Sequence, residues 1–191
     1  MTDAEKKLYI IAGANGSGKS TFAKELLKCE RLDFLNADDL AKKLSPHDIE
    51  KVKIAAGKEL FKQLDKVLQN GDSFAIETTL SGSVHVKTIA RAKAAGYKVI
   101  LIYVFLDNPE MCIARIKGRV KSGGHFIPDD DVRRRYRRSF HNFETVYKEL
   151  ADAWFLYYNG MEQVAVANYA DGKTEILNTE LFGLFQEKCH V

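Results

Sequence analysis

Cysteine and proline are scarce in this chain of 191 residues, and it has no long apolar run. The three cysteines, Cys29, Cys112 and Cys189, are far apart and form no CxxC pair. This spacing argues against a disulfide framework or a structural zinc site, and it favours a reducing compartment. The apolar run at 8–12 is too short for a signal-peptide core or a membrane span. We therefore expect a cytoplasmic protein with no membrane partner.

An excess of charge of one sign is also absent. The sequence has 29 Lys and Arg against 26 Asp and Glu, a formal net charge of +3. This balance is too mild to indicate nucleic-acid binding by itself. Hydrophobic residues make up 46% and charged residues 29%, which is ordinary for a globular protein and argues against disorder. The length and the lack of repeats or linkers predict a single domain over 1–191.

Apolar, strand-like runs alternate with longer amphipathic segments. We predict strands at 8–12, 34–36, 73–76, 99–106, 154–158, 164–169 and 174–177. We predict helices at 21–28, 49–68, 84–95 and 109–121, with others beginning at Leu40 and near Pro128. This order predicts an α/β fold with a mostly parallel, five-stranded sheet flanked by helices. Asp171-Gly172 predicts a hairpin turn, so we expect 160–191 to form an appendage of a β-hairpin and a helix.

A phosphate-binding motif, GxxxxGK[ST], follows the first predicted strand and precedes the first predicted helix. Its glycines let backbone N–H groups surround phosphate oxygens, and the helix N-terminus favours negative charge. Lys19 is the expected contact of the β- and γ-phosphates, and the Ser20 hydroxyl the expected Mg²⁺ ligand. The motif predicts a P-loop NTPase that binds a nucleoside triphosphate with Mg²⁺ through Gly13, Ala14, Asn15, Gly16, Ser17, Gly18, Lys19, Ser20 and Thr21.

Two acidic residues follow the second predicted strand. In small P-loop kinases this strand end faces the acceptor, where a carboxylate can orient the attacking hydroxyl and take its proton. We assign that role to Asp38, and we assign Asp39 to the N-cap of the helix that begins at Leu40. Asp107 ends another predicted strand, before Asn108-Pro109. It is either an acidic partner of the phosphate loop or a helix cap.

The segment Glu77-Thr78-Thr79 places an acid and two hydroxyls at the end of a further predicted strand. Open α/β sheets bind ligands at the carboxyl edge of their parallel strands. We therefore predict that Glu77, Thr78 and Thr79 bind substrate. Glu77 has two possible partners, the acceptor or a Mg²⁺-bound water. The alternative is a surface acid without function.

Nine basic residues lie between positions 115 and 138, and the same segment contains three acidic residues, Asp129 to Asp131. A loop at 122–128, with His125 at its centre, separates two basic helical segments. This pattern predicts a lid that closes over the triphosphate while its arginines neutralise the transferring phosphoryl group. Nucleic-acid binding by the cluster at 133–138 is an alternative, and at least half of these arginines should be solvated or paired with the aspartates. His125 is either a phosphate contact or only a loop residue.

Together these motifs resemble the zeta toxin family of P-loop kinases, especially its shorter branch, often labelled predicted ABC-type ATPases. The matching elements span residues 8 to about 160. They are Gly13–Thr21, Asn36-Ala37-Asp38, the segment Glu77-Thr78-Thr79-Leu80-Ser81-Gly82, Gly123-Gly124-His125-Phe126-Ile127-Pro128, Arg134-Arg135-Tyr136, and the aromatic strand around Trp154.

The resemblance implies a kinase that moves the γ-phosphate of ATP or GTP to a hydroxyl of a UDP-amino sugar such as UDP-N-acetylglucosamine. It implies that Lys19 binds phosphate, Ser20 holds magnesium, Asp38 is the base and Glu77 binds the acceptor. Two lid arginines would stabilise the transferring phosphate. Arg115, Arg119, Arg134 and Arg135 are candidates, of which we assign Arg119 and Arg134, and we add His125 to the substrate contacts. The resemblance also implies a possible antitoxin partner. The alternatives are a kinase for another hydroxyl metabolite and a nucleic-acid-associated NTPase.

Overall fold

Strands and helices alternate along most of the chain, of which the computed structural model describes residues 5–29, 32–45 and 48–189. The strands are β1 (Lys7–Ala12), β2 (Asp33–Asn36), β3 (Phe74–Thr78), β4 (Lys98–Phe105), β5 (Ala153–Asn159), β6 (Gln163–Ala170) and β7 (Lys173–Ile176). The helices are α1 (Lys19–Cys29), α2 (Ala37–Leu44), α3 (Ile49–Asn70), α4 (Val84–Ala94), α5 (Pro109–Lys121), α6 (Asp129–Asn142), the π-helical segment η1 (Phe143–Tyr147), α7 (Lys148–Leu150) and α8 (Thr179–Cys189).

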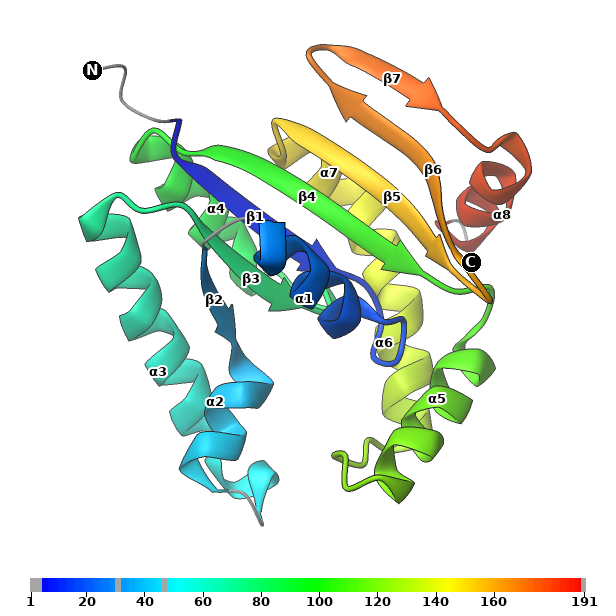
Figure 1. The fold of residues 1–191 in the computed structure, drawn as a ribbon, viewed down its shortest axis with the longest axis horizontal. Helices are drawn as coiled ribbons and strands as arrows, with labels where there is room; N and C mark the ends of the chain where they lie inside the picture. Colours follow the sequence, from blue (N-terminus) through cyan, green and yellow to red (C-terminus); the bar gives the residue numbers. More distant parts are fainter. Residues whose placement is uncertain (1–4, 30–31, 46–47, 190–191) are drawn as a thin grey trace.

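All seven strands form one sheet in the order β2-β3-β1-β4-β5-β6-β7 (Figure 1). The first five are parallel, which confirms the predicted α/β class and the mostly parallel sheet flanked by helices. The C-terminal hairpin is present. Its turn residues Asp171 and Gly172 both have positive φ, as a type I′ turn requires. The hairpin is continuous with the main sheet, because β6 pairs antiparallel with β5 along Trp154–Asn159.

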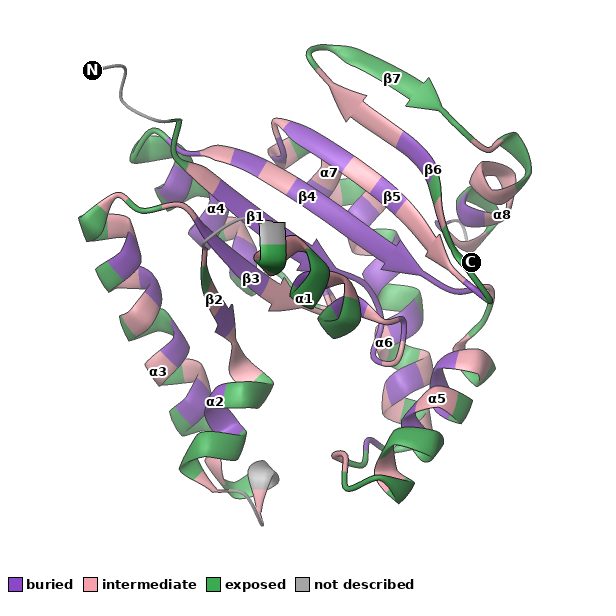
Figure 2. Cartoon of the chain, in the orientation of Figure 1, coloured by how far each residue is buried: buried purple, intermediate pink, exposed green. Residues whose placement is uncertain are grey.

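The two faces of the sheet pack against different helices. Successive strand residues point to opposite faces. Leu8 and Ile10 of β1 therefore enter the larger core, while Tyr9 and Ile11 enter a smaller one beneath α1. The larger core also takes in aromatic side chains of α6, η1 and α8, among them Phe140, Phe143 and Phe185. Figure 2 shows the resulting burial of β1, β4 and β5, in contrast to the exposed β7. The central strands are thus covered on both sides.

Two absences predicted from the sequence concern cysteine chemistry and membrane spans. Cys112 and Cys189 are free and buried, and burial raises the pKa of the two thiols to about 11 and about 12. The side chain of Cys29 lies outside the described part of the structure. Within the described residues, no helix has the length and apolarity needed to cross a membrane.

The carboxyl ends of the parallel strands meet along one edge of the sheet, where open α/β folds bind ligands. The phosphate loop leaves β1 at this edge, Asn36 ends β2 and Thr78 ends β3. Helices α2 and α3 lie on one side of it, and α5 with the loop that follows lies on the other (Figure 1). The fold therefore brings the predicted phosphate, acceptor and lid segments around one opening.

Candidate active site

The phosphate loop takes a backbone conformation that its glycines permit. Gly13, Gly16 and Gly18 have φ values of 139°, 83° and 102°. A Cβ atom on Gly13 would lie 2.1 Å from the carbonyl oxygen of Val104, far inside any real contact. The loop therefore passes directly over β4, and glycine is required where it does so. The predicted strand–loop–helix context of the motif is confirmed.

Lys19 lies inside this loop with 5% of its surface exposed. Its Nζ donates to the carbonyl oxygen of Ala14 at 2.8 Å. Burial lowers the pKa of Lys19, and the Glu77 carboxylate opposes that shift. The Ser17 hydroxyl, also in the loop, is buried and has no partner among the described residues. An anion cradled by the loop would give the Ser17 hydroxyl a partner and compensate the buried charge of Lys19.

Glu77 connects the phosphate loop to β2. Its Oε1 accepts a hydrogen bond from the Ser20 hydroxyl at 2.9 Å, and its Oε2 accepts one from the Asn36 side-chain amide at 3.1 Å. Burial raises the pKa of Glu77, and the nearby ammonium of Lys19 opposes the shift. The contact places the Glu77 carboxylate beside Ser20, the predicted Mg²⁺ ligand, and the choice between the two partners expected for Glu77 stays a prediction.

The start of α2 differs from the sequence-based prediction. The helix begins at Ala37 instead of Leu40, and Asn36 is the N-cap, since its side-chain oxygen accepts a hydrogen bond from the Asp38 N–H at 2.8 Å. Asp39, predicted to be the cap, instead forms an ion pair with Lys42 at 3.8 Å. A preceding asparagine can fill the cap equally well, so the prediction placed the helix too late. Asp38 consequently sits in the first helical turn.

Helix α5, which belongs to the predicted lid and is called the lid helix below, is fastened to the end of β5. Arg115 donates to the carbonyl oxygens of Asn159 and Gly160 at 2.8 and 2.7 Å. The Asn159 side-chain amide in turn donates to the carbonyl oxygen of Ser17 at 2.7 Å. The sequence analysis missed Asn159, and a polar residue at the end of a predicted strand was the available signal. One asparagine therefore joins the lid helix to the phosphate loop.

The predicted lid residues separate into two groups. Arg119 lines the opening and also donates to the backbone oxygen of His125 at 3.3 Å. Arg135 donates to the Asn15 side chain at 3.3 Å, so it reaches the phosphate loop from α6. Arg134 pairs with Asp131 at 2.8 Å, and Arg135 also approaches Asp131, at 3.6 Å. Neighbouring helix residues differ by about 100° in direction, and of these two arginines only Arg135 contacts the phosphate loop, so the catalytic role assigned to Arg134 stays a prediction without a contact to that loop.

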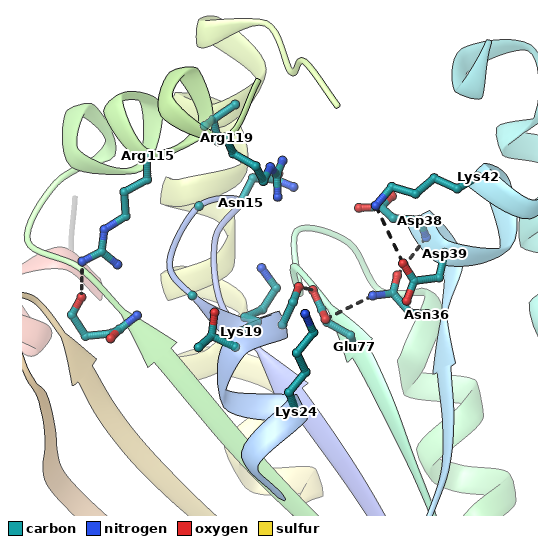
Figure 3. Close-up of a pocket in the computed structure, with 16 residues that line it drawn as sticks. Asn15, Lys19, Lys24, Asn36, Asp38, Asp39, Lys42, Glu77, Arg115 and Arg119 are labelled. Atoms are coloured by element: carbon teal, nitrogen blue, oxygen red, sulfur yellow. Dashed lines mark hydrogen bonds and ion pairs between the residues drawn. The ribbon is translucent and has the colours of Figure 1, made fainter. Parts of the chain in front are cut away.

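Two adjoining cavities occupy the opening. The larger, of about 410 Å³, lies against the phosphate loop, the start of α2 and the lid helix (Figure 3). The smaller, of about 190 Å³, is lined by Thr78, Thr79, His85 and Arg135, among others. Both cavities are lined by Asn15, Lys19, Asn36, Asp38 and Glu77. His125, a predicted substrate contact, lines neither of them.

Besides Asn159, three ionisable cavity-lining residues were missed in the sequence. Lys24, one turn beyond Ser20 on α1, and Lys42 on α2 add positive charge to the rim of the larger cavity. His85 lines the smaller cavity. Asp107, for which two roles were open, takes neither. Asn108 is the helix cap that accepts the Met111 N–H, and Asp107 lines neither of the two cavities described above.

A magnesium ion fits the donors at the phosphate loop. The described residues contain no group of three or more His, Cys, Asp or Glu that would hold a metal by protein ligands alone. Mg²⁺ bound with a nucleotide needs no such group, because phosphates and water supply most of its ligands. The Ser20 hydroxyl, 2.9 Å from the Glu77 carboxylate, is the donor set that this mode of binding uses.

Comparisons with known proteins agree with this geometry. The profile of the AAA_33 family, described as an AAA domain, matches residues 8–143. An uncharacterized protein of Haemophilus influenzae is 34% identical over 132 residues, which cover 69% of this chain and 94% of that protein. The gluconokinase of Arabidopsis thaliana is 30% identical over 141 residues, which cover 66% of this chain and 74% of the enzyme.

Solved structures with the same fold include two from protein complexes. The AvrRxo1-ORF1:-ORF2 complex contains a chain with a TM-score of 0.75 and 18% identity, and the match covers 97% of this chain and 64% of that chain. The PezAT chromosomal toxin–antitoxin system of Streptococcus pneumoniae contains another, with a TM-score of 0.70, 16% identity and coverage of 100% and 88%. At these identities the likeness concerns the fold.

Proposed function

This chain belongs to the AAA_33 family of kinase-like P-loop proteins, and from that premise we propose that it is a phosphotransferase. It moves the γ-phosphate of ATP or GTP to a hydroxyl group of a small molecule. One observation carries the proposal. Asp38 lines both the cavity at the phosphate loop and the smaller cavity beside it. An NTPase that uses water needs no second compartment, whereas a kinase needs a base between its donor and its acceptor.

Each residue has a role in this scheme. The backbone of the phosphate loop and Lys19 bind the β- and γ-phosphates, and Ser20 with Glu77 would hold Mg²⁺. When bound, Mg²⁺ neutralises charge on the phosphate oxygens. Asp38 orients the acceptor hydroxyl and takes its proton as the phosphoryl group transfers. Arg119 and Arg135 approach from the lid side and stabilise the charge of the transition state.

The acceptor we propose is a UDP-amino sugar such as UDP-N-acetylglucosamine. The zeta toxin motifs of the sequence support it. Toxicity and an antitoxin partner belong to the same proposal. Expression should then harm the host, and Lys19→Ala should relieve the harm.

A second acceptor class has its own support. The relative in Arabidopsis thaliana is a gluconokinase, so a hydroxyl of a sugar acid is the alternative. The nucleic-acid reading is weakened, because Arg133 pairs with Glu110 and Asp130, and Arg134 pairs with Asp131. These arginines are already neutralised within the protein.

A transfer assay tests the proposal. The protein is incubated with γ-labelled ATP or GTP, Mg²⁺ and, separately, UDP-N-acetylglucosamine, UDP-glucose or D-gluconate. Labelled acceptor from one of them is the expected product, and Lys19→Ala should abolish it. Lys28→Ala, which removes an exposed lysine of the same helix, is the matched control and should be as active as wild type. Release of inorganic phosphate with every acceptor, and no labelled acceptor, would refute the proposal.

A further inference from the structure

His85 is a buried histidine that the scheme above does not use. It is the second residue of α4, it has 7% of its surface exposed, and it lines the smaller cavity together with Thr78 and Thr79. Its Nδ1 atom is fully buried and has no hydrogen-bond partner among the described residues. Burial lowers the pKa of His85 to about 4, so the imidazole is neutral at physiological pH. A buried nitrogen without a hydrogen-bond partner destabilises the folded protein unless a ligand supplies that partner.

The loop that leads to His85 is held in place by side chains of α6 and η1. Leu80 has a φ of 51°, which non-glycine residues rarely adopt. Its carbonyl oxygen accepts a hydrogen bond from the Asn142 side chain at 2.6 Å, and that of Gly82 accepts one from the Tyr147 hydroxyl at 2.6 Å. Asn142 directly precedes the π-helical segment η1 and Tyr147 is its last residue, and such segments are frequent at functional sites. The strained backbone at Leu80 is held by these two hydrogen bonds, which indicates that the fold fixes the position of His85.

The charges around the cavity limit what His85 can bind. Of the described residues that line it, the cations are Lys19 and Arg135. Lys19 donates to Ala14 and Arg135 donates to Asn15, so both are turned toward the phosphate loop. The other polar groups of the lining are the carboxylates of Asp38 and Glu77, the side-chain amides of Asn15 and Asn36, the hydroxyls of Thr78 and Thr79, and the neutral imidazole of His85. Such groups recognise hydroxyls and amides, whereas a carboxylate would require a cation.

We propose that His85 is a specificity-determining contact of the acceptor, and that its imidazole exchanges a hydrogen bond with a neutral hydroxyl or amide of that molecule. The inference rests on the proposed function, since it assumes that the smaller cavity holds the acceptor. It favours an acceptor whose bound part is an uncharged sugar ring over a sugar acid.

The test combines a spectroscopic and a kinetic measurement on the full chain. UDP-N-acetylglucosamine and D-gluconate are titrated into protein labelled with ¹⁵N-histidine, and His85→Asn identifies the resonances of His85. We expect the sugar nucleotide to shift them. Without a hydrogen bond, His85→Phe should raise the KM for the acceptor about tenfold and leave the KM for ATP within about twofold. His85→Asn keeps a polar atom near the Nδ1 position and should restore most of the loss. Thermal unfolding establishes that each variant is folded.

A matched control is His141→Asn, which changes an exposed histidine of α6 and should alter neither KM. The outcomes separate the two proposals. A His85 shift without phosphate transfer to any acceptor would refute the proposed function and keep the assignment of His85. Transfer with an unchanged acceptor KM in both folded His85 variants would refute the assignment and keep the function. If neither compound shifted the His85 resonances, the assignment of His85 would also be refuted.

Discussion

The replacement of Gly13 by alanine tests how the phosphate loop is held over the sheet. The new Cβ would lie 2.1 Å from the carbonyl oxygen of Val104 and 2.8 Å from the Ser17 hydroxyl. The hydroxyl can rotate away, but the carbonyl cannot. Val104 belongs to β4, which pairs with β1 on one side and β5 on the other. The backbone of the loop must therefore move, and the phosphate cradle moves with it.

The structure sets the size of the effect. At a φ of 139° a residue with a side chain costs about 1–2 kcal/mol, and relief of the overlap with the β4 backbone adds about 1–3 kcal/mol. Gly57→Ala is the matched control, because Gly57 lies inside α3 and a Cβ there meets nothing within 4 Å. Alanine should stabilise that helix by about 0.5–1 kcal/mol. The same chemical change thus has opposite effects at the two positions.

Thermal unfolding and nucleotide titration measure both effects. For a domain of this size each kcal/mol shifts the Tm by about 2–4 °C. Gly13→Ala should lower the Tm by roughly 5–15 °C and lose ATP affinity, while Gly57→Ala should raise the Tm slightly and bind ATP as wild type does. A Gly13→Ala protein as stable as Gly57→Ala, with wild-type affinity for ATP, would refute the reasoning.

Three further predictions concern the site. Burial raises the pKa of Glu77, so the folded protein keeps a proton that the unfolded chain has released, and wild-type stability falls as the pH rises above the ordinary carboxyl pKa. The Tm of Glu77→Gln minus the Tm of wild type should therefore increase from pH 4 to pH 7. A Tm difference that does not change with pH would contradict this. Arg135→Ala should slow transfer about a hundredfold, and Arg134→Ala less than about threefold, in steady-state assays; equal losses would contradict the assignment. Asn159→Ala should weaken ATP binding about tenfold by calorimetry, because the Ser17 carbonyl loses its donor, and unchanged affinity would contradict this role.

Features that depend on neighbouring residues were predictable from the sequence. The phosphate loop between a strand and a helix and the hairpin turn at Asp171-Gly172 are local patterns with a local physical cause. The mostly parallel sheet followed from the alternation of strands and helices. The start of α2 was misplaced because Asn36 and Asp39 are both good caps, and only the backbone decides between them.

Features that depend on distant residues were not predictable. Asn159 reaches Ser17 across 142 residues of sequence, and no periodicity encodes that contact. Arg134 and Arg135 are adjacent and chemically identical, so the choice between them depends on how α6 is rotated. His85 lies in an amphipathic helix, where a histidine has no distinguishing pattern until the cavity beside it is known.

The central claim is that Asp38 stands between donor and acceptor, and Asp38→Asn tests it most directly. In that variant, the dissociation constant for ATP should remain within about threefold of wild type, while transfer of labelled phosphate to the acceptor should fall at least about a hundredfold. The amide keeps the size of the side chain but cannot take a proton. Transfer at the wild-type rate by folded Asp38→Asn would contradict the claim.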